Sequence, residues 1–197
     1  MAARSTPDGI VAGRGTKSAI RDAAVKLFGD KGFEQTSLRE VADAVGITKA
    51  SLYYHYASKL ELLHAIIDPI IDHLRSVVVD IEQRPHDPDT IRDVLRNYLR
   101  GMVSHRDAGA LVLRDTVTIV NAVADRHPDL VDDDQALREW LAGPDPTDEA
   151  KLRASAALAM LGVALMSKEF APGADDGLVE ATLLDAATCV LTARDCA

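Results

Sequence analysis

The sequence has few cysteines, few aromatic residues and no long apolar run. The cysteines and the apolar runs exclude particular classes of protein. The only two cysteines, Cys189 and Cys196, are too few and too close together for a disulfide framework or a metal cage. No eighteen consecutive residues are apolar, so we expect no membrane span. No apolar stretch follows the first arginine, so we expect no signal peptide and a cytoplasmic location.

Motifs that carry catalysis are also missing. The sequence contains no G-x-S-x-G, no H-E-x-x-H and no glycine loop that could cradle a phosphate. His64, Asp68 and Asp72 share a helical face with metal-compatible residue types, but an exposed charged face has the same pattern. We therefore expect no catalytic residue, no metal and no cofactor, with a helical-bundle enzyme or small-molecule carrier as the alternative.

What the sequence does have is helical periodicity throughout, with no strand-like alternation. Ile20, Ala24, Leu27 and Phe28 form the apolar stripe of the first helix. The predicted helices are 17–30, 38–45, 48–56, 59–83 (bent near Pro69), 88–104, 109–126, 130–142, 147–169 and 176–194. The expected class is all-α with about nine helices.

Charge divides the chain into two parts. Residues 1–60 hold nine Lys/Arg against six Asp/Glu, whereas residues 61–197 hold thirteen against twenty-five. A basic N-terminal part on a body of net charge −12 indicates that only the N-terminal part meets a polyanion. A non-specific DNA binder would need a basic surface throughout, which this body contradicts. Residues 1–16 lack an apolar period, and we expect them to form a flexible arm.

Two capping boxes mark helix starts inside the N-terminal part. Ser37 with Glu40 and Ser58 with Glu61 both follow the S-x-x-E spacing, in which each side chain satisfies a backbone donor at the helix start. Gly46 is placed to end the helix that begins after Ser37, and Thr48 to cap the next one. Two short helices joined by a tight turn form a helix-turn-helix.

Three of the four tyrosines lie on or beside the second of these helices, at positions 53, 54 and 56. Helical spacing puts Lys49, Ala50 and Tyr53 on its outward side, opposite the buried Leu52. Lysine donates to guanine edges, and alanine or tyrosine can pack on thymine methyl groups, so this side suits a DNA major groove. Tyr56 is expected to turn into the core. Side chains at the ends and flanks are expected to bind phosphates: Thr48, Tyr54, His55 and Lys59.

The stretch TSLREVADAVGITKASLYYHYASKLELL, residues 36–63, resembles the N-terminal domain of the TetR family of transcriptional repressors. The matching positions include Leu27-Phe28, Gly32-Phe33, Thr36, Ala42, Gly46, Leu52-Tyr53, His55-Tyr56 and Lys59. Ala50 and Tyr56 depart from the commoner Gly and Phe, which bears on the operator that is read. The resemblance implies a further base-reading residue, Arg39. With it, the expected phosphate contacts become Thr36, Ser37, Thr48, Ser51, Tyr54, His55 and Lys59.

The resemblance also implies an architecture and a function. It implies a helix-turn-helix DNA-binding domain at 17–63 and a helical effector-binding and dimerisation domain at 64–197. The implied function is that of a homodimeric repressor that binds a palindromic double-stranded DNA operator and is released by a small-molecule effector.

Small and large apolar residues alternate in the last two helices, a composition that allows close helix approach between subunits. The alternative is that these residues face the subunit's own core. The expected dimer contacts are Ala157, Met160, Leu161, Ala164, Leu165, Leu183, Ala186, Ala187 and Val190.

The expected effector pocket centres on three polar residues at i, i+4, i+7 spacing in the segment 109–126, although the same spacing is more typical of the solvated side of a helix. The expected pocket residues are Arg114, Thr118 and Asn121, with Met102, His105 and Trp140.

Overall fold

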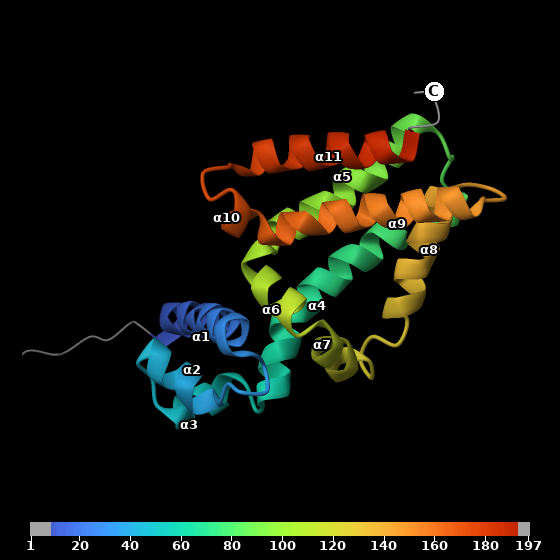
Figure 1. The fold of residues 1–197 in the computed structure, drawn as a ribbon. Coiled ribbons are helices and arrows are strands. Elements are labelled where there is room, and N and C mark those ends of the chain that lie inside the picture. The colour runs from blue at the N-terminus through green and yellow to red at the C-terminus, as the bar shows by residue number, and fades with distance from the viewer. Residues whose placement is uncertain (1–8, 193–197) are drawn as a thin grey trace, which may run out of the picture.

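The chain forms helices joined by short turns and loops in residues 9–192, the part that the computed structural model describes, and it forms no strand there (Figure 1). In chain order the helices are α1 (Gly9–Lys31), α2 (Leu38–Val45), α3 (Lys49–His55), α4 (Lys59–Val78), η1 (Ile81–Gln83), α5 (Pro88–Ser104), η2 (Arg106–Ala108), α6 (Gly109–Arg114), α7 (Thr116–Val123), α8 (Leu130–Ala142), α9 (Asp148–Gly162), η3 (Val163–Met166), α10 (Ser167–Phe170) and α11 (Asp176–Thr192). The all-α class is confirmed. The described residues form more and shorter helices than periodicity predicts.

Helix ends differ most from the prediction at the start of α1 and the end of α4. The helix α1 begins at Gly9, so residues 9–16, which are expected in a flexible arm, are helical, and residues 1–8 lie outside the described part. The helix α4 ends at Val78 rather than near Gln83, because Asp80 takes a left-handed conformation with φ 57°. Pro69 lies inside α4, and a bend there stays a prediction.

Two predicted helices are interrupted. The segment 109–126 divides at Asp115 into α6 and α7, and the segment 147–169 divides into α9, η3 and α10. By length and composition, Asp148–Phe170 could cross a membrane. Its apolar side chains Ala154 and Leu158 are instead buried in a cluster with residues of α5 and α11, as in a core helix of the fold.

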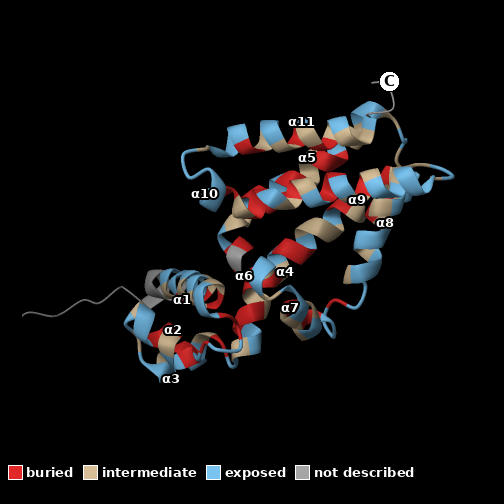
Figure 2. Cartoon of the chain, in the orientation of Figure 1, coloured by how far each residue is buried: buried red, intermediate tan, exposed pale blue. Residues whose placement is uncertain are grey.

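We refer to α1, α2 and α3 as the head and to the helices from α4 on as the body. The head lies at one corner of the molecule, and each of its helices contains buried residues (Figures 1 and 2). Phe28, Val41 and Leu52 form its core with Ile66 of α4, and the same cluster continues to Ile119 of α7. The expected domain boundary after residue 63 therefore falls within one packed cluster.

The body places α5, α9 and α11 together above α4, with α8 along one side (Figure 1). Its core contains Val94, Leu99, Leu158, Leu161 and Ala187, all nearly or fully buried. The helix α4 runs from the head into this layer, so it connects the two cores.

Candidate nucleic-acid interface

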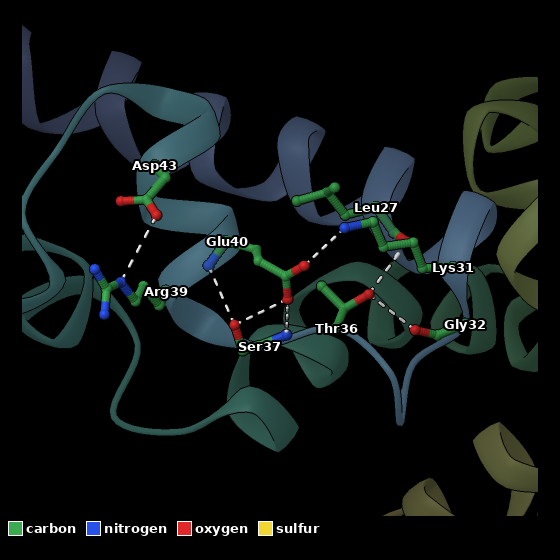
Figure 3. A network of polar contacts seen from close by, with 8 residues as sticks. All are labelled: Leu27, Lys31, Gly32, Thr36, Ser37, Arg39, Glu40 and Asp43. Atoms are coloured by element: carbon green, nitrogen blue, oxygen red, sulfur yellow. Dashed lines mark hydrogen bonds and ion pairs between the residues drawn. The ribbon is translucent and has the colours of Figure 1, made fainter.

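The start of α2 is fixed by side chains on both sides (Figure 3). The Ser37 hydroxyl accepts from the Glu40 N–H at 3.3 Å, and the Glu40 carboxylate accepts from the Ser37 N–H at 2.8 Å, which confirms the predicted capping box. Lys31, in the last turn of α1, donates to the other Glu40 oxygen at 2.7 Å. The Lys31 hydrogen bond and those from Ser37 lower the pKa of Glu40 to about 2. These bonds tie α2 to the end of α1.

The turn between α2 and α3 depends on Gly46. Its φ of 74° is left-handed, and a Cβ there would meet nothing within 4 Å, so the backbone conformation rather than space favours glycine. Thr48 then caps α3, because its hydroxyl oxygen accepts from the Ser51 N–H at 3.1 Å. The predicted helix-turn-helix is confirmed, and its second helix is α3.

The helix α3 turns the expected side chains away from the protein. Leu52 is 0 % exposed in the head core and Tyr56 is 3 % exposed, as predicted, with the Tyr56 hydroxyl donating to the Lys17 carbonyl at 3.4 Å. Lys49 and Ala50 are exposed, and Tyr53 is 44 % exposed. The Lys49 Nζ lies 5.5 Å from the centroid of the Tyr53 ring, so the two residues form one surface of mixed charge and apolar area.

Polar groups flank this surface. The Thr48 hydroxyl uses its oxygen as an acceptor in the cap, which leaves its proton free to donate outward. Tyr54 is 87 % exposed, and its ring stands edge-on to that of the half-buried His55, with centroids 5.4 Å apart. Ser51 is half-buried on the first turn of α3. These four residues are available as phosphate donors.

Arg39 and Ser37 differ in how available they are. The Arg39 side chain is exposed, and its Nε lies 3.9 Å from Asp43, a surface pair that contributes little to stability and leaves the guanidinium accessible (Figure 3). The Ser37 hydroxyl, by contrast, donates to Glu40 at 2.9 Å. The Arg39 guanidinium therefore has N–H donors that are free for a ligand, whereas the only hydroxyl donor of Ser37 is used within the protein.

Thr36 is not a surface residue, which corrects its assignment as a phosphate contact. It is 2 % exposed, and its hydroxyl lies 2.9 Å from the Gly32 carbonyl and 3.2 Å from that of Leu27 (Figure 3). The hydroxyl therefore satisfies carbonyls at the end of α1.

Lys59 is half-buried and binds backbone carbonyls of the head. Its Nζ donates to the carbonyls of Phe33 and Glu34 at 2.9 and 3.2 Å and lies 4.4 Å from the centroid of the Phe33 ring. Two of its three donors are thereby used within the protein. Its main contacts stabilise the turn between α1 and α2, rather than leaving the ammonium extended toward a phosphate.

The six expected pocket residues do not converge. Arg114 and Thr118 lie on opposite sides of the break at Asp115, and the Arg114 guanidinium donates to carbonyls of α1. Asn121 is exposed on α7, and Met102 is buried in the body core. His105 caps the end of α5, where burial, followed by the nearby His73 and Arg21, lowers its pKa.

Trp140 lies elsewhere, with its ring edge-on to that of His86 at 5.3 Å. It lines an open hollow of about 320 Å³ that also includes Arg84, Gly143 and Pro144. The expected effector pocket is therefore not formed by the predicted set.

A different cavity lies between α4, α5 and α8. Its volume is about 30 Å³, and its wall is mainly apolar with a few polar groups at one side. The lining residues are Ile71, Leu74, Arg75, Val78, Tyr98, Leu130, Asp133, Asp134 and Leu137. Arg75 lies 3.3 Å from Asp133, and burial together with Asp134 raises the pKa of Tyr98 to about 12. Ile71, Arg75 and Val78 share one face of α4 at i, i+4, i+7, a spacing that could have indicated this cavity.

The expected dimer contacts mostly face the subunit's own core. Ala157, Leu161, Ala164, Leu165 and Ala187 are buried within the chain, so the prediction that they meet a partner is wrong. The other four are half-buried: Met160, Leu183, Ala186 and Val190.

The outward face of α9 instead carries residues that the prediction missed. Leu152, Ala156 and Ala159 are exposed at i, i+4, i+7 spacing, and the exposed Val163, the first residue of η3, follows at i+11. On α11 the exposed residues include Leu178, Ala181, Thr182, Asp185 and Cys189. The helices α9 and α11 pack side by side.

The helical face with metal-compatible residues makes ion pairs. Asp68 lies 2.9 Å from Nε2 of the buried His127 and 3.1 Å from Arg126, and Nδ1 of His64 lies 3.5 Å from it. Among the described residues, no group of three or more His, Cys, Asp or Glu side chains is arranged to hold a metal ion.

Residues 20–66 match the model of "Bacterial regulatory proteins, tetR family". The regulator IcaR of Staphylococcus epidermidis, a negative transcriptional regulator of the biofilm operon icaADBC, is 35 % identical over 83 residues, which are 42 % of this chain and 43 % of that protein. IcaR of Staphylococcus aureus (strain Newman) is 38 % identical over 63 residues, 32 % of this chain and 34 % of that protein. The chain thus covers less than half the length of these relatives.

Two solved structures share the fold over most of the chain. The TetR family regulator PfmR of Thermus thermophilus aligns with a TM-score of 0.66 and 24 % identity, covering 87 % of this chain and 96 % of that one. AmtR of Mycobacterium smegmatis aligns with a TM-score of 0.70 and 21 % identity, covering 96 % and 89 %. The family model therefore matches only the N-terminal part, while the shared fold extends over most of the chain.

Proposed function

The chain belongs to the TetR family of bacterial regulatory proteins, and we propose that it is a homodimeric repressor that binds a palindromic operator and is released by a small-molecule effector. In this reading it regulates transcription in the cytoplasm and is not an enzyme.

One observation carries the proposal: Lys49, Ala50 and Tyr53 face outward on a helix whose opposite side, through Leu52, is anchored in the head core. A helix held in this way can enter the major groove so that those three side chains point toward the base edges. Lys49 reads guanine edges, and Ala50 and Tyr53 contact thymine methyl groups. Arg39 adds a donor from α2.

Phosphate contacts then come from groups whose donors are free. Thr48, Ser51, Tyr54 and His55 lie at the ends and flanks of α3, where they fix its register on the duplex without reading sequence. Thr36 and Ser37 are left out because their hydroxyl donors are used within the head, and Lys59 is left out because two of its three donors are.

The dimer forms through the exposed stripes of α9 and α11, which meet the same stripes of a second copy. Exposed alanines such as Ala156 and Ala159 permit the helices to approach closely, and Leu152 and Val163 supply apolar area. A two-fold axis there puts two α3 helices about 34 Å apart, one turn of B-DNA, and the operator is accordingly a near-palindrome.

The effector enters the cavity between α4, α5 and α8. Its walls are apolar, and Arg75, Tyr98 and Asp133 provide a few polar groups, the composition that small-molecule sites have. The helix α4 belongs both to this cavity and to the head core, so separating its walls changes the tilt of the head. Release requires that the ligand bind the non-operator state more tightly, by a few kcal/mol at most.

Selection of bound duplexes from a random DNA pool tests the proposal directly. A recovered near-palindrome with half-sites one helical turn apart supports an operator-reading dimer. Enrichment without a common sequence would indicate a non-specific binder. No retention of DNA at low salt would contradict DNA binding itself and favour the helical carrier or enzyme.

A further inference from the structure

Beyond the apolar cluster that the head shares with α4, η2, α6 and α7, two features hold the head against the body. One is the continuous helix α4, which begins in the head and ends in the body. The other is the break between α6 and α7, where Arg114 and Asp115 reach the end of α1. Apolar packing is non-directional, so directed hydrogen bonds at a second place add to what α4 and the shared cluster do to fix the tilt of the head.

Asp115 binds the turn that follows α1. Its Oδ2 accepts from the Phe33 N–H at 2.7 Å across a part-buried contact. A hydrogen bond to a charged acceptor in such a position is stronger than a neutral one.

Arg114 binds the last turn of α1 beside this contact. Its Nη1 donates to the carbonyls of Gly29 (3.3 Å) and Asp30, which belong to the last four residues of α1 and so lack partners within the helix. A cation at a helix C-terminus is also favoured by the helix dipole.

Gly32 leaves room for this attachment. Its φ of 96° is left-handed, and a Cβ there would lie 3.2 Å from Oδ2 of Asp115 and 3.7 Å from Nε of Arg114. The backbone conformation and the space that the two side chains occupy both favour glycine.

The same turn is held from its other side by α4. Lys59 donates to the Phe33 carbonyl, so the N–H of Phe33 is bound by the α6–α7 break and its C=O by the start of α4. The turn leads directly into α2, whose buried Leu38 and Val41 share a core with Leu52 of α3. The position of this turn therefore sets the position of the reading helix relative to the body.

We propose that Arg114 and Asp115 are positioning residues for operator reading: they hold the head at the tilt at which both α3 helices of a dimer meet one operator in register. This inference rests on the proposed function. The two residues act through the α1–α2 turn and touch no DNA. A shift of α6–α7 against α1 would release the head without unfolding it.

A comparison of full and half operators isolates this role. The probes are the palindrome recovered from the random pool and a duplex that contains only one half-site. When the first head binds a palindrome, a correctly tilted second head meets its half-site at high effective concentration. Heads that are no longer held at this tilt lose the advantage on the palindrome. The binding of one head to a half-site is unaffected.

The expected result is that Asp115→Ala lowers the preference for the palindrome over the half-site by about tenfold, the size expected for a lost charge-assisted hydrogen bond. Half-site affinity stays within about twofold of the wild type. Arg114→Ala shifts the preference in the same direction. Asp115→Asn restores most of it, because the amide oxygen still accepts from the Phe33 N–H.

Asp125→Ala is the matched control, because it removes one negative charge from an exposed position just beyond α7 and leaves the contact with α1 intact. It is expected to behave as the wild type on both duplexes. Circular dichroism and thermal melting of every variant identify any that fail to fold.

Two results would overturn the inference. In one, Asp115→Ala keeps the wild-type preference for the palindrome. In the other, it loses full-site and half-site affinity equally, which is the pattern of a merely structural role. If the wild type itself shows no preference for a palindrome, the proposed function fails instead, so the two failures are distinguishable.

Discussion

Lys31 and Glu40 join the end of α1 to the start of α2, with Nζ and Oε1 2.7 Å apart. The second carboxylate oxygen of Glu40 accepts from both the N–H and the hydroxyl of Ser37. A single carboxylate therefore fixes the angle between the two helices that support the reading helix.

We expect acid to weaken the contacts of Glu40 with Lys31 and Ser37, which join α1 to α2, before it unfolds the body. Because the pKa of Glu40 is lowered from 4.5 to about 2, its stabilising effect is complete above pH 4.5 and is lost as the pH falls toward 2. We expect Glu40→Gln to be less stable than the wild type at pH 7 and to approach it below pH 3. Thermal melting across this pH range measures the difference, and Glu82→Gln on the exposed surface of η1 should show no such convergence.

Replacing the outward side chains of α3 should weaken operator binding without affecting assembly. We expect Lys49→Ala and Tyr53→Ala each to lower affinity by about tenfold or more, because each contact with a base edge contributes roughly 1–3 kcal/mol. Gel-shift titration measures the affinity, and size-exclusion chromatography checks that the oligomeric state is unchanged. Arg84→Ala, in the body, removes the same charge as Lys49→Ala and should have little effect. Unchanged binding by both α3 variants would contradict the assignment of this helix.

Lys59 should matter for stability more than for DNA. Removing its ammonium leaves the carbonyls of Phe33 and Glu34 without a charged donor, and we expect Lys59→Ala to lower the free energy of unfolding by about 1–2 kcal/mol. Urea denaturation measures this loss, with the exposed Lys49→Ala as a control of equal charge. A normal unfolding free energy with a salt dependence of DNA binding reduced by about one unit would instead restore Lys59 as a phosphate contact.

A charge on the outward face of α9 should separate the subunits. Ala159 is exposed in the middle of its apolar stripe, and we expect Ala159→Arg to give a folded monomer because two arginines would meet near the two-fold axis. Sedimentation velocity gives the mass and circular dichroism the helicity. Ala124→Arg, at an exposed position after α7, should stay dimeric. A dimeric Ala159→Arg protein would show that another surface forms the interface.

The head could be predicted from sequence because its signals are local. Capping residues such as Ser37 and Thr48, the glycine at position 46 and the apolar period of α2 each act within a few residues. Thr36 is assigned wrongly, and the role of Lys59 stays untested, for a related reason. Their partners are carbonyls at the end of α1 and in the turn after it, and spacing alone cannot distinguish such internal acceptors from phosphates.

The body is harder to predict because its deciding contacts are distant in sequence. Apolar and small residues occur on several sides of α9 and α11, so periodicity does not define which side faces the core, and Ala157 and Ala159 are indistinguishable by type. No glycine or proline lies next to Asp115, so the sequence does not indicate the break between α6 and α7. The Asp115 side chain binds Phe33, 82 residues away along the chain.

The small cavity between α4, α5 and α8 has a practical consequence for finding the effector. A space of about 30 Å³ holds a water molecule or two, so this conformation has no room for an organic ligand. An effector that uses it must bind a wider conformation, and its apparent affinity falls in proportion to the fraction of molecules that are open. Soaking crystals of the closed form should therefore fail with compounds that co-crystallise readily, and screens in solution near the melting temperature should detect ligands that docking into the closed cavity would reject.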